Sequence, residues 1–256
     1  MRPGFIGTGT IAAAMVEGLG GNALLSPRGA AMAADLAARF PGVSIAVSNQ
    51  AVVDDSDLVV LAVRPQVAEE VVRPLRFRAG QKVLSLVAAT QIETIRGWIG
   101  TDLPVIRAIP LPFVAKRRGV TPIFPADPDV ADLFNRLGQA VDCRTLGEFD
   151  LFAVGSALMG SYFGILETAQ TWMEAQGLPA PQARAYLAGL FANLGTVAEG
   201  SPQGFGTLRE EYSTKGGLNE QVFRVFAEAG GTAALGEALD QVLARVRGLG
   251  PATPGD

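Results

Sequence analysis

The chain has 256 residues, of which 48% are hydrophobic and 18% charged, and its formal net charge is −4. This length supports a sizeable core, and the acidic balance, with a pI near 5.0, argues against a surface for nucleic acid or anionic membrane. The sequence has no histidine and one cysteine, Cys143. It therefore excludes Ser-His-Asp and Cys-His catalysis and an internal disulfide, and it argues against a zinc or other metal site.

The N-terminus and the apolar runs bear on the compartment of the protein. No basic segment followed by an apolar core and a small-residue cleavage site precedes the first motif. The longest apolar run, Leu58–Val63, suits a buried strand and is shorter than a membrane span. We therefore expect a cytoplasmic protein in which Cys143 is a small buried hydrophobe.

The start of the chain carries its most informative motif, a short apolar strand that runs into Gly7-x-Gly9-x-x-Ala12 and a helix of small residues. Gly7 allows a tight turn, Gly9 lets the backbone approach a pyrophosphate, and Ala12 lets the helix pack closely on a sheet. Backbone N–H groups at the helix N-terminus would then face the anion. Small residues also serve ordinary strand–helix turns. The motif predicts cofactor contacts at Gly7, Thr8, Gly9, Thr10 and Ile11.

The end of the second predicted strand bears on the choice of cofactor. In a dinucleotide fold, an acidic residue at this place accepts the 2′-OH of NAD. Here the chain reads Leu25-Ser26-Pro27-Arg28, with a hydroxyl and an arginine but no carboxylate. We therefore expect Ser26 and Arg28 to favour NADP(H) over NAD(H). The alternative is that Pro27-Arg28 only opens the next helix with a solvated charge.

Short apolar segments alternate with helical periodicity as far as residue 147, and the strands are apolar on both faces. This pattern is typical of a parallel sheet covered by helices. Beyond the first strand and helix, the predicted strands are Ala23–Ser26, Val43–Val47, Leu58–Val63, Lys82–Val87, Val105–Ile109 and Ala140–Arg144, and the predicted helices are Ala30–Phe40, Gln50–Asp54, Val67–Leu75, Ile92–Trp98 and Val130–Leu137. Three basic residues at 116–118 are expected to be solvated.

From about Glu148 onward only helical periodicity remains. The predicted helices are Leu151–Gln176, Pro181–Glu199, Asn219–Ala229 and Thr232–Arg247. The first of them leaves little surface for water and should be buried, either in its own bundle or against another subunit. The fold class is therefore α/β, with an N-terminal Rossmann-type doubly wound parallel sheet over residues 1–147 and an all-helical C-terminal domain over residues 148–256.

Ligands of open α/β sheets bind at the carboxyl ends of the strands. Pro65 stops one strand at that edge, and the small residues Val87-Ala88-Ala89 end the next and would leave room for a nicotinamide ring. Taken alone, either segment supports ordinary strand termination better than a cofactor contact. The cofactor contacts predicted at this edge are Ala62, Val63, Arg64, Pro65 and Ala88.

Five stretches keep an order and spacing that extend over nearly the whole chain: Phe5-Ile6-Gly7-x-Gly9, Ser48-Asn49 before Ala51-Val52, Leu61–Gln66, Arg107-x-Ile109-Pro110, and Gly216-Gly217 ahead of a helix. Together they resemble the pyrroline-5-carboxylate reductase family. The resemblance implies a Rossmann domain that binds NAD(P)H and a helical domain that binds substrate and dimerises by interlocking with its mate. Hydride would pass to the C=N carbon of a cyclic imino acid, giving proline. Asn49 would contact the cofactor near the ribose.

Three segments depart from the family pattern. The chain has Ile109-Pro110-Leu111-Pro112-Phe113 where the family has Met-Pro-Asn-Thr-Pro, Ala157–Phe163 where it has Ser-Gly-Ser-Gly-Pro-Ala-Tyr, and Thr214–Asn219 where it has Ser-Pro-Gly-Gly-Thr-Thr. The last family loop holds the substrate carboxylate. Losing hydroxyls from a buried polar site costs about 1–3 kcal/mol each, so unchanged substrate choice is not expected.

The expected substrate contacts follow from the same loop. Gly216 and Gly217 can present N–H groups to an anion, with Ser213 and Lys215 nearby. The candidate catalytic residues are Ser161, Thr214 and Asn219. The alternative is that the glycines only form a turn and that Lys215 is a solvated charge. Tyr162 and Tyr212 are expected to cap a helical core.

The leading hypothesis is an NADP(H)-dependent oxidoreductase, with NAD(H) as the alternative cofactor, that acts on a small carboxylate-bearing imine or the matching amine and forms a homodimer or a higher oligomer. A β-hydroxyacid-type dehydrogenase acting on a carbonyl is the second hypothesis; it usually needs a lysine on the long helix, and none occurs between Lys116 and Lys215. The third is a nucleotide-binding protein without turnover. The direction of the reaction and the proton donor stay open.

Overall fold

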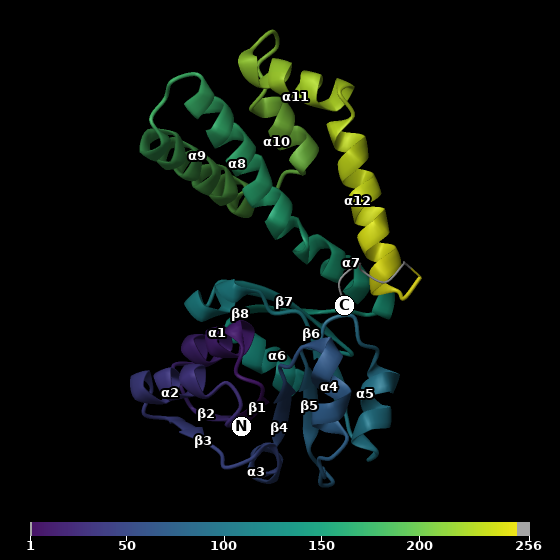
Figure 1. Cartoon of the computed structure of the whole chain (residues 1–256). Helices are drawn as coiled ribbons and strands as arrows, with labels where there is room; N and C mark the ends of the chain where they lie inside the picture. Colours follow the sequence, from purple (N-terminus) through teal and green to yellow (C-terminus); the bar gives the residue numbers. More distant parts are fainter. Residues whose placement is uncertain (1, 250–256) are drawn as a thin grey trace. The chain divides into compact units, whose positions relative to one another are not determined.

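The computed structural model describes residues 2–249, which form two compact units (Figure 1). The first unit takes the described residues up to Ala153 together with those from Leu243 onward, and the second spans Val154–Val242. The predicted domain boundary between residues 147 and 148 lies shortly before Ala153, after which the chain first passes from the first unit to the second. The second crossing returns the end of the chain to the first unit, which a linear division of the sequence does not describe.

The first unit is built on an eight-stranded sheet with the strand order β3-β2-β1-β4-β5-β6-β7-β8. The strands are β1 Pro3–Ile6, β2 Ala23–Leu25, β3 Val43–Ile45, β4 Leu58–Leu61, β5 Lys82–Ser85, β6 Val105–Ala108, β7 Gly119–Phe124 and β8 Gly138–Asp142. In this spatial order, all strands from β3 through β2, β1, β4 and β5 to β6 run parallel to one another. The predicted Rossmann-type sheet is confirmed.

One strand, β7, was not predicted, and it runs antiparallel to β6. A crossover between parallel strands needs a dozen or more residues, usually a helix. The connection from Ala108 to Gly119 holds only the short 3-10 helix η1, Pro112–Lys116, so the chain turns back on itself. Pro122 within the strand also weakens its sequence signal. β8 then pairs parallel to β7.

Helices cover both faces of this sheet, as its doubly apolar strands predict. Phe5 and Leu25 face one side, where they pack with α1 Thr10–Leu19, α2 Ala30–Arg39 and α6 Pro128–Asn135. Ile6 and Leu61 face the other side, with α3 Asn49–Asp54, α4 Pro65–Val72 and α5 Ile92–Ile99. Neighbouring residues of one strand thus enter opposite cores.

The basic residues at 116–118 are exposed, as expected for solvated charges, and two of them also make contacts. The Lys116 ammonium pairs with the Glu17 carboxylate at 3.0 Å, and the Arg117 guanidinium donates to the carbonyl of Gly18 at 2.8 Å. Both contacts tie η1 to α1. A Cβ on Gly18 would collide with the carbonyl of Val114, so this glycine permits the close approach of the two elements.

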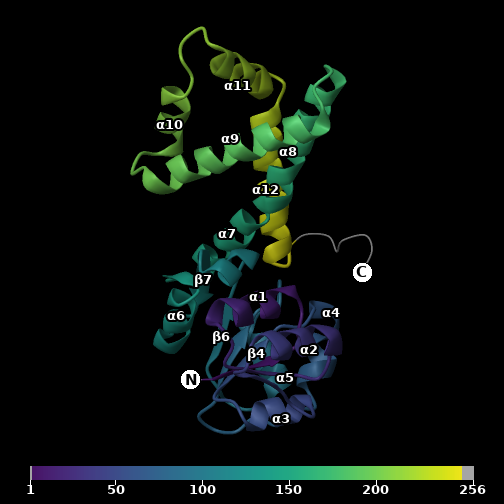
Figure 2. The same cartoon turned by 90° about the vertical axis from the view of Figure 1, so that its left-hand side faces the viewer.

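The second unit consists of helices, with α7 and α12 leading into and out of it. They are α7 Leu146–Ser156, α8 Leu158–Ala175, α9 Ala180–Gly200, α10 Phe205–Glu211, α11 Leu218–Glu228 and α12 Gly231–Val246. The long helix predicted over Leu151–Gln176 is in fact two, because the helix breaks at Ala157. The short α10 was not predicted. Figure 2 shows α9 crossing α8, against which it packs.

The helical unit leaves much of its apolar surface exposed. Phe163, Ile165 and Trp172 on α8 are each more than half exposed, and no residue of α8 is fully buried. Burial of the long helix within its own bundle is therefore wrong for the single chain. By length and composition, Leu146–Ala175 also meets the requirements of a membrane span, with a mean hydropathy of 1.5 over its most apolar window, a test that a core helix of a soluble protein passes as well.

Candidate functional site

The glycine turn after β1 is held by its neighbours on both sides. Gly7 has φ +96°, and a Cβ there would lie 2.6 Å from the carbonyl oxygen of Ala62, so no other residue fits. Its N–H donates to Oγ of Ser26 at 3.0 Å. The hydroxyl of Thr8 donates to the carbonyl of Arg28. The turn is thereby tied to the ends of β2 and β4.

Beyond the turn, the N-terminus of α1 offers unused hydrogen-bond donors. Within residues 2–249, the N–H groups of Gly9, Thr10 and Ile11 have no protein partner, and no side chain caps the helix. A Cβ on Gly9 would meet no atom within 4 Å, so the space in front of it is open. Ala12 is fully buried where α1 meets the sheet. Free N–H groups at the positive end of a helix form an anion site.

Ser26 and Arg28 have different places in the structure. Ser26 is fully buried, and its Oγ accepts the N–H of Gly7. Its hydroxyl can still donate a hydrogen bond, so its contact with the cofactor stays a prediction. The Arg28 guanidinium is exposed and has no partner in the described part of the chain. The predicted contact of Arg28 with a phosphate needs no existing contact to be broken.

The remaining predicted cofactor contacts lie at the same sheet edge. Asn49 is the first residue of α3, whose cap Ser48 accepts the N–H of Ala51 at 3.1 Å. Ala62, Val63, Arg64 and Pro65 join β4 to α4, and Ala88 follows β5. All of them come after the carboxyl ends of parallel strands. β1 lies between β2 and β4, so the strand order reverses here and leaves the crevice in which open α/β sheets bind ligands.

The predicted substrate loop lies in the second unit, and the structure corrects how it was expected to bind an anion. The N–H of Gly217 donates to the carbonyl of Thr214 at 2.8 Å, and the N–H of Gly216 donates to the carboxylate of Glu220 at 2.5 Å. Neither glycine N–H is free. Beside this loop, the described residues with unused backbone donors are Leu218, Asn219 and Glu220, in the first turn of α11.

Side chains around this loop are positioned by its own backbone. Nδ2 of Asn219 donates to the carbonyl of Tyr212 at 2.8 Å, which leaves Oδ1 of Asn219 available. Thr214 and Lys215 are exposed, and Ser213 is half-buried. Tyr212 is 47% exposed, so it does not cap a core in the single chain. The loop is thus preformed, with hydroxyl and ammonium groups at its surface.

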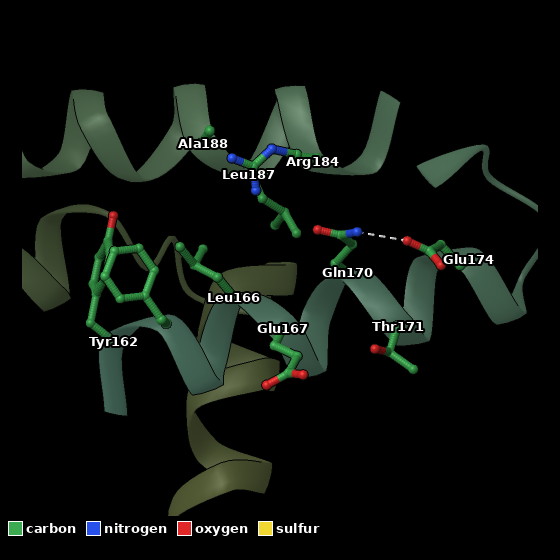
Figure 3. Close-up of a pocket in the computed structure, with 10 residues that line it drawn as sticks. Tyr162, Leu166, Glu167, Gln170, Thr171, Glu174, Arg184, Leu187 and Ala188 are labelled. Carbon is green, nitrogen blue, oxygen red and sulfur yellow. Dashed lines mark hydrogen bonds between the residues drawn. The ribbon is translucent and has the colours of Figure 1, made fainter. Parts of the chain in front are cut away.

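Ser161 and Tyr162 lie on α8. Among the described residues, neither side chain forms a hydrogen bond with this loop. The Tyr162 ring packs edge-on against Phe163 and Phe191, with centroid distances of 5.1 and 5.7 Å. It also lines a pocket of about 420 Å³ between α8 and α9 (Figure 3). There the Gln170 amide donates to Glu174 at 2.8 Å. The predicted site residues do not line this pocket.

A buried charged cluster was missed by sequence reasoning. Arg107 on β6 is 4% exposed, and its guanidinium lies 4.7 Å from the ring centroid of Phe149. Burial lowers the pKa of this guanidinium below its ordinary value, against the raising effect of Asp150 and Glu93. Asp150 is also 4% exposed. The available signal was one carboxylate within an otherwise apolar run, Phe149–Val154.

Two family models match separate segments of the chain. Residues 2–89 match the family described as NADP oxidoreductase coenzyme F420-dependent, and residues 150–249 match pyrroline-5-carboxylate reductase dimerisation. The pyrroline-5-carboxylate reductase of Vibrio alginolyticus is 25% identical over 257 residues, which is 94% of each chain. The chain belongs to the pyrroline-5-carboxylate reductase family.

Two further comparisons extend this result. The pyrroline-5-carboxylate reductase of Pseudomonas aeruginosa is 30% identical over 165 residues, which is 61% of this chain and 56% of that protein. The crystal structure of Plasmodium falciparum pyrroline carboxylate reductase with NADP bound has a TM-score of 0.81 at 15% identity and covers 98% of both chains. At that identity the likeness concerns the fold, which this pyrroline-5-carboxylate reductase family member shares along its length.

In this pyrroline-5-carboxylate reductase family member, the segment after β6 has become apolar. Pro110 is buried, Leu111 is half-buried, and Phe113 in η1 is 54% exposed. The resemblance places an Asn-Thr pair in this segment, beside the nicotinamide. The segment after β6 in this chain therefore lacks the amide and the hydroxyl with which that pair could hydrogen-bond a polar substrate group.

Proposed function

We propose that the protein reduces the C=N bond of a small carboxylate-bearing imino acid, with NADPH as the hydride donor. The observation that carries the proposal is the row of unpartnered N–H groups at Gly9, Thr10 and Ile11, which faces open space beside an unpaired Arg28. Such a row binds a pyrophosphate, and a guanidinium beside it binds a further phosphate. Family membership supports both the cofactor and the reaction.

The chain's own residues would bind and orient the reactants. The N–H groups of α1 would hold the pyrophosphate, Arg28 the 2′-phosphate, and the short side chains of Ala62 and Ala88 would leave room for the nicotinamide ring. When bound, the cofactor supplies the hydride. The free N–H groups in the first turn of α11 would hold the substrate carboxylate. Ser161, Thr214 and Asn219 stay candidates for contacts with the reacting group.

Proton supply does not require histidine in this reaction. An imine with a basic nitrogen arrives as an iminium ion, so the protein needs mainly to position it and exclude water. The chain has no histidine, and its single cysteine is buried. Burial and the nearby carboxylates of Glu148 and Asp142 raise the pKa of the Cys143 thiol, which leaves it protonated and inert. The reaction class fits this set of residues.

We further propose that the functional form is a homodimer made by the helical unit, in the cytoplasm. Exposed Phe163, Ile165, Trp172 and Leu190 on α8 and α9 support this, since a single chain rarely presents so much apolar surface to water. The match of residues 150–249 to a dimerisation family supports it as well. The same apolar character lets Leu146–Ala175 meet the length and composition of a membrane span.

The test is a spectrophotometric assay of the purified protein. We expect oxidation of NADPH when pyrroline-5-carboxylate or a related cyclic imino acid is added, and slower oxidation of NADH. Because three substrate segments depart from the family pattern, the panel includes imines of different ring size and with apolar substituents. NADPH binding by calorimetry without turnover of any imine would favour a nucleotide-binding protein. Turnover of carbonyls alone would favour a β-hydroxyacid-type dehydrogenase.

A further inference from the structure

The two places where the chain crosses between its compact units are close to one ion pair. The chain leaves the first unit after Ala153 and returns to it at Leu243. Asp150 stands just before the first crossing, and Arg247 follows the second. Oδ2 of Asp150 lies 3.7 Å from Nε of Arg247, and both residues belong to the first unit. One contact thus joins both connecting segments.

A second guanidinium, that of Arg107, interacts electrostatically with the same carboxylate. Arg107 is buried on β6, and its charge interacts with that of Asp150. Its guanidinium also stacks over Phe149, at 4.7 Å, and its NH1 donates to Oε1 of Gln91 at 3.5 Å. Gln91 caps α5 and follows the Ala88-Ala89 edge. Arg107 therefore contacts the segment after β5 and the start of α7 together.

Burying the charges of this cluster carries a desolvation penalty that lowers stability. Asp150 has a side-chain exposure of 6%, and its Oδ1 accepts no hydrogen bond from the described residues. Burying a charged pair of this kind is often no better for stability than a well-packed apolar pair. An apolar residue at 150 would agree better with the run of apolar residues around it. Stability alone does not account for these charges.

We propose that Arg107 and Asp150 are positioning residues for the reduction. Together with Arg247, they hold the segments after β5 and β6, which carry Ala88 and Ile109, in register with the start of α7 and the residues that follow α12, all within the first unit. The inference rests on the proposed function. Catalysis by orientation is sensitive to such registration, since an error of about 1 Å costs roughly a hundredfold in rate.

The test separates positioning from stability with a pair of variants. Arg107→Met leaves the buried Asp150 carboxylate with only the partly exposed Arg247 as a cationic partner and should lower Tm. Arg107→Met combined with Asp150→Leu removes both charges and should recover most of the lost Tm. We expect kcat of the double variant to stay roughly tenfold or more below that of the parent, with Kd for NADPH unchanged. Recovery of kcat together with Tm would overturn the proposal.

A third variant covers the case in which the double variant does not fold. Arg247 is 44% exposed, so Arg247→Gln should leave Tm unchanged yet lower kcat several-fold. Arg245→Gln, on the last turn of α12, is the matched control and should leave kcat unchanged. Equal kcat values in the Arg247 and Arg245 variants would contradict the role of the ion pair.

Hydrogen exchange tests the coupling of the two segments without requiring any turnover of substrate. We expect hydrogen exchange of the backbone over residues 146–153 to be faster in Arg247→Gln than in the parent or in Arg245→Gln. If the parent reduces no imine, the proposed reaction fails, while faster exchange still supports the coupling of the two segments. Unchanged exchange in Arg247→Gln refutes that coupling directly.

Discussion

The carboxylate of Glu220 accepts a hydrogen bond of 2.5 Å from the backbone N–H of Gly216, at the start of α11. In this position it occupies one of the two donors that were expected to bind the substrate carboxylate. Its charge also lies beside the free N–H groups of the first turn, where an incoming carboxylate would bind. An acidic residue in the first turn of a helix stabilises that helix, so this contact has a structural role as well.

We predict that Glu220→Gln lowers KM for a carboxylate-bearing imine several-fold, because it removes a negative charge beside the anion site. Steady-state kinetics at low ionic strength would measure this, with kcat little changed. Glu228→Gln, at the far end of α11, serves as the matched control. A rise in KM for Glu220→Gln would mean that the carboxylate orders the loop rather than competes for it.

The two glycines of the first motif should fail in different ways. Gly7→Ala places a Cβ at φ +96° and against the Ala62 carbonyl, so it should lower the free energy of unfolding by about 2–4 kcal/mol. Gly9→Ala has room and an ordinary φ of −84°, so stability should change by less than about 1 kcal/mol.

Gly9→Ala should instead weaken NADPH binding at least about tenfold, since the methyl group would occupy the place of the pyrophosphate. Urea unfolding and calorimetry measure the two quantities in the same preparations. Unchanged NADPH affinity in a folded Gly9→Ala protein would show that the nucleotide does not lie against this turn.

Arg28→Asp should shift the cofactor preference toward NADH. Replacing a free guanidinium by a carboxylate repels the 2′-phosphate of NADPH and offers an acceptor to the 2′-OH of NADH. We expect Kd for NADPH to rise roughly ten- to a hundredfold and Kd for NADH to change little. Arg136→Asp, at the end of α6, controls for the change in net charge. Equal preference before and after the substitution would remove the argument for NADP(H).

Phe163→Asp should weaken self-association of the helical unit. The side chain is 66% exposed in the single chain, and burying a carboxylate in an apolar interface is unfavourable. Sedimentation velocity should show a lighter species for this variant. Val47→Asp, at a side chain 91% exposed on the first unit, should sediment like the parent. A parent protein that is monomeric at micromolar concentration would refute the proposed dimer.

The stability that the Lys82 ion pairs contribute should depend on pH. Its ammonium pairs with Asp127 at 2.7 Å and Asp129 at 2.6 Å, and hydrogen bonds to these carboxylates raise its pKa above 10.5. Because the pKa is higher in the folded state, the stabilisation is complete below the unfolded pKa and is lost as pH rises through the folded one. Lys82→Met should therefore cost about 1 kcal/mol near neutral pH.

The stability difference between parent and Lys82→Met should shrink only at alkaline pH. Chemical unfolding across a pH series would measure it. A difference that shrinks between neutral pH and pH 9 would place the effect on other groups.

Much of the nucleotide-binding unit could be predicted from local pattern. The Gly7 turn, the alternation of apolar strands with helices and the lack of an acid after β2 each depend on neighbouring residues, and the predicted sheet and family are confirmed. Ser26 illustrates the limit. Its position after β2 was clear, yet only the pairing of β1 with β2 shows that its hydroxyl oxygen accepts the N–H of Gly7.

The helical half was less predictable, and the reason is physical. A strong apolar periodicity marks helices but does not reveal what covers them, so α8 seemed buried although its apolar side chains are exposed in the single chain. The Gly216-Gly217 pair likewise looked like a free anion site. Glu220 comes to Gly216 only when the first turn of α11 forms and brings its carboxylate back over the loop.

By itself, the sequence determined the fold class, the family and a phosphate-binding start to the chain, because each depends on periodicity, backbone freedom or spacing along a short segment. The tertiary structure alone decided which donors are free and which charges meet. Arg107, Asp150 and Arg247 are far apart in the chain and have no common motif. Their side chains are brought together only when α7 and the end of α12 pack on the sheet, since burial makes charges that are otherwise solvated depend on one another.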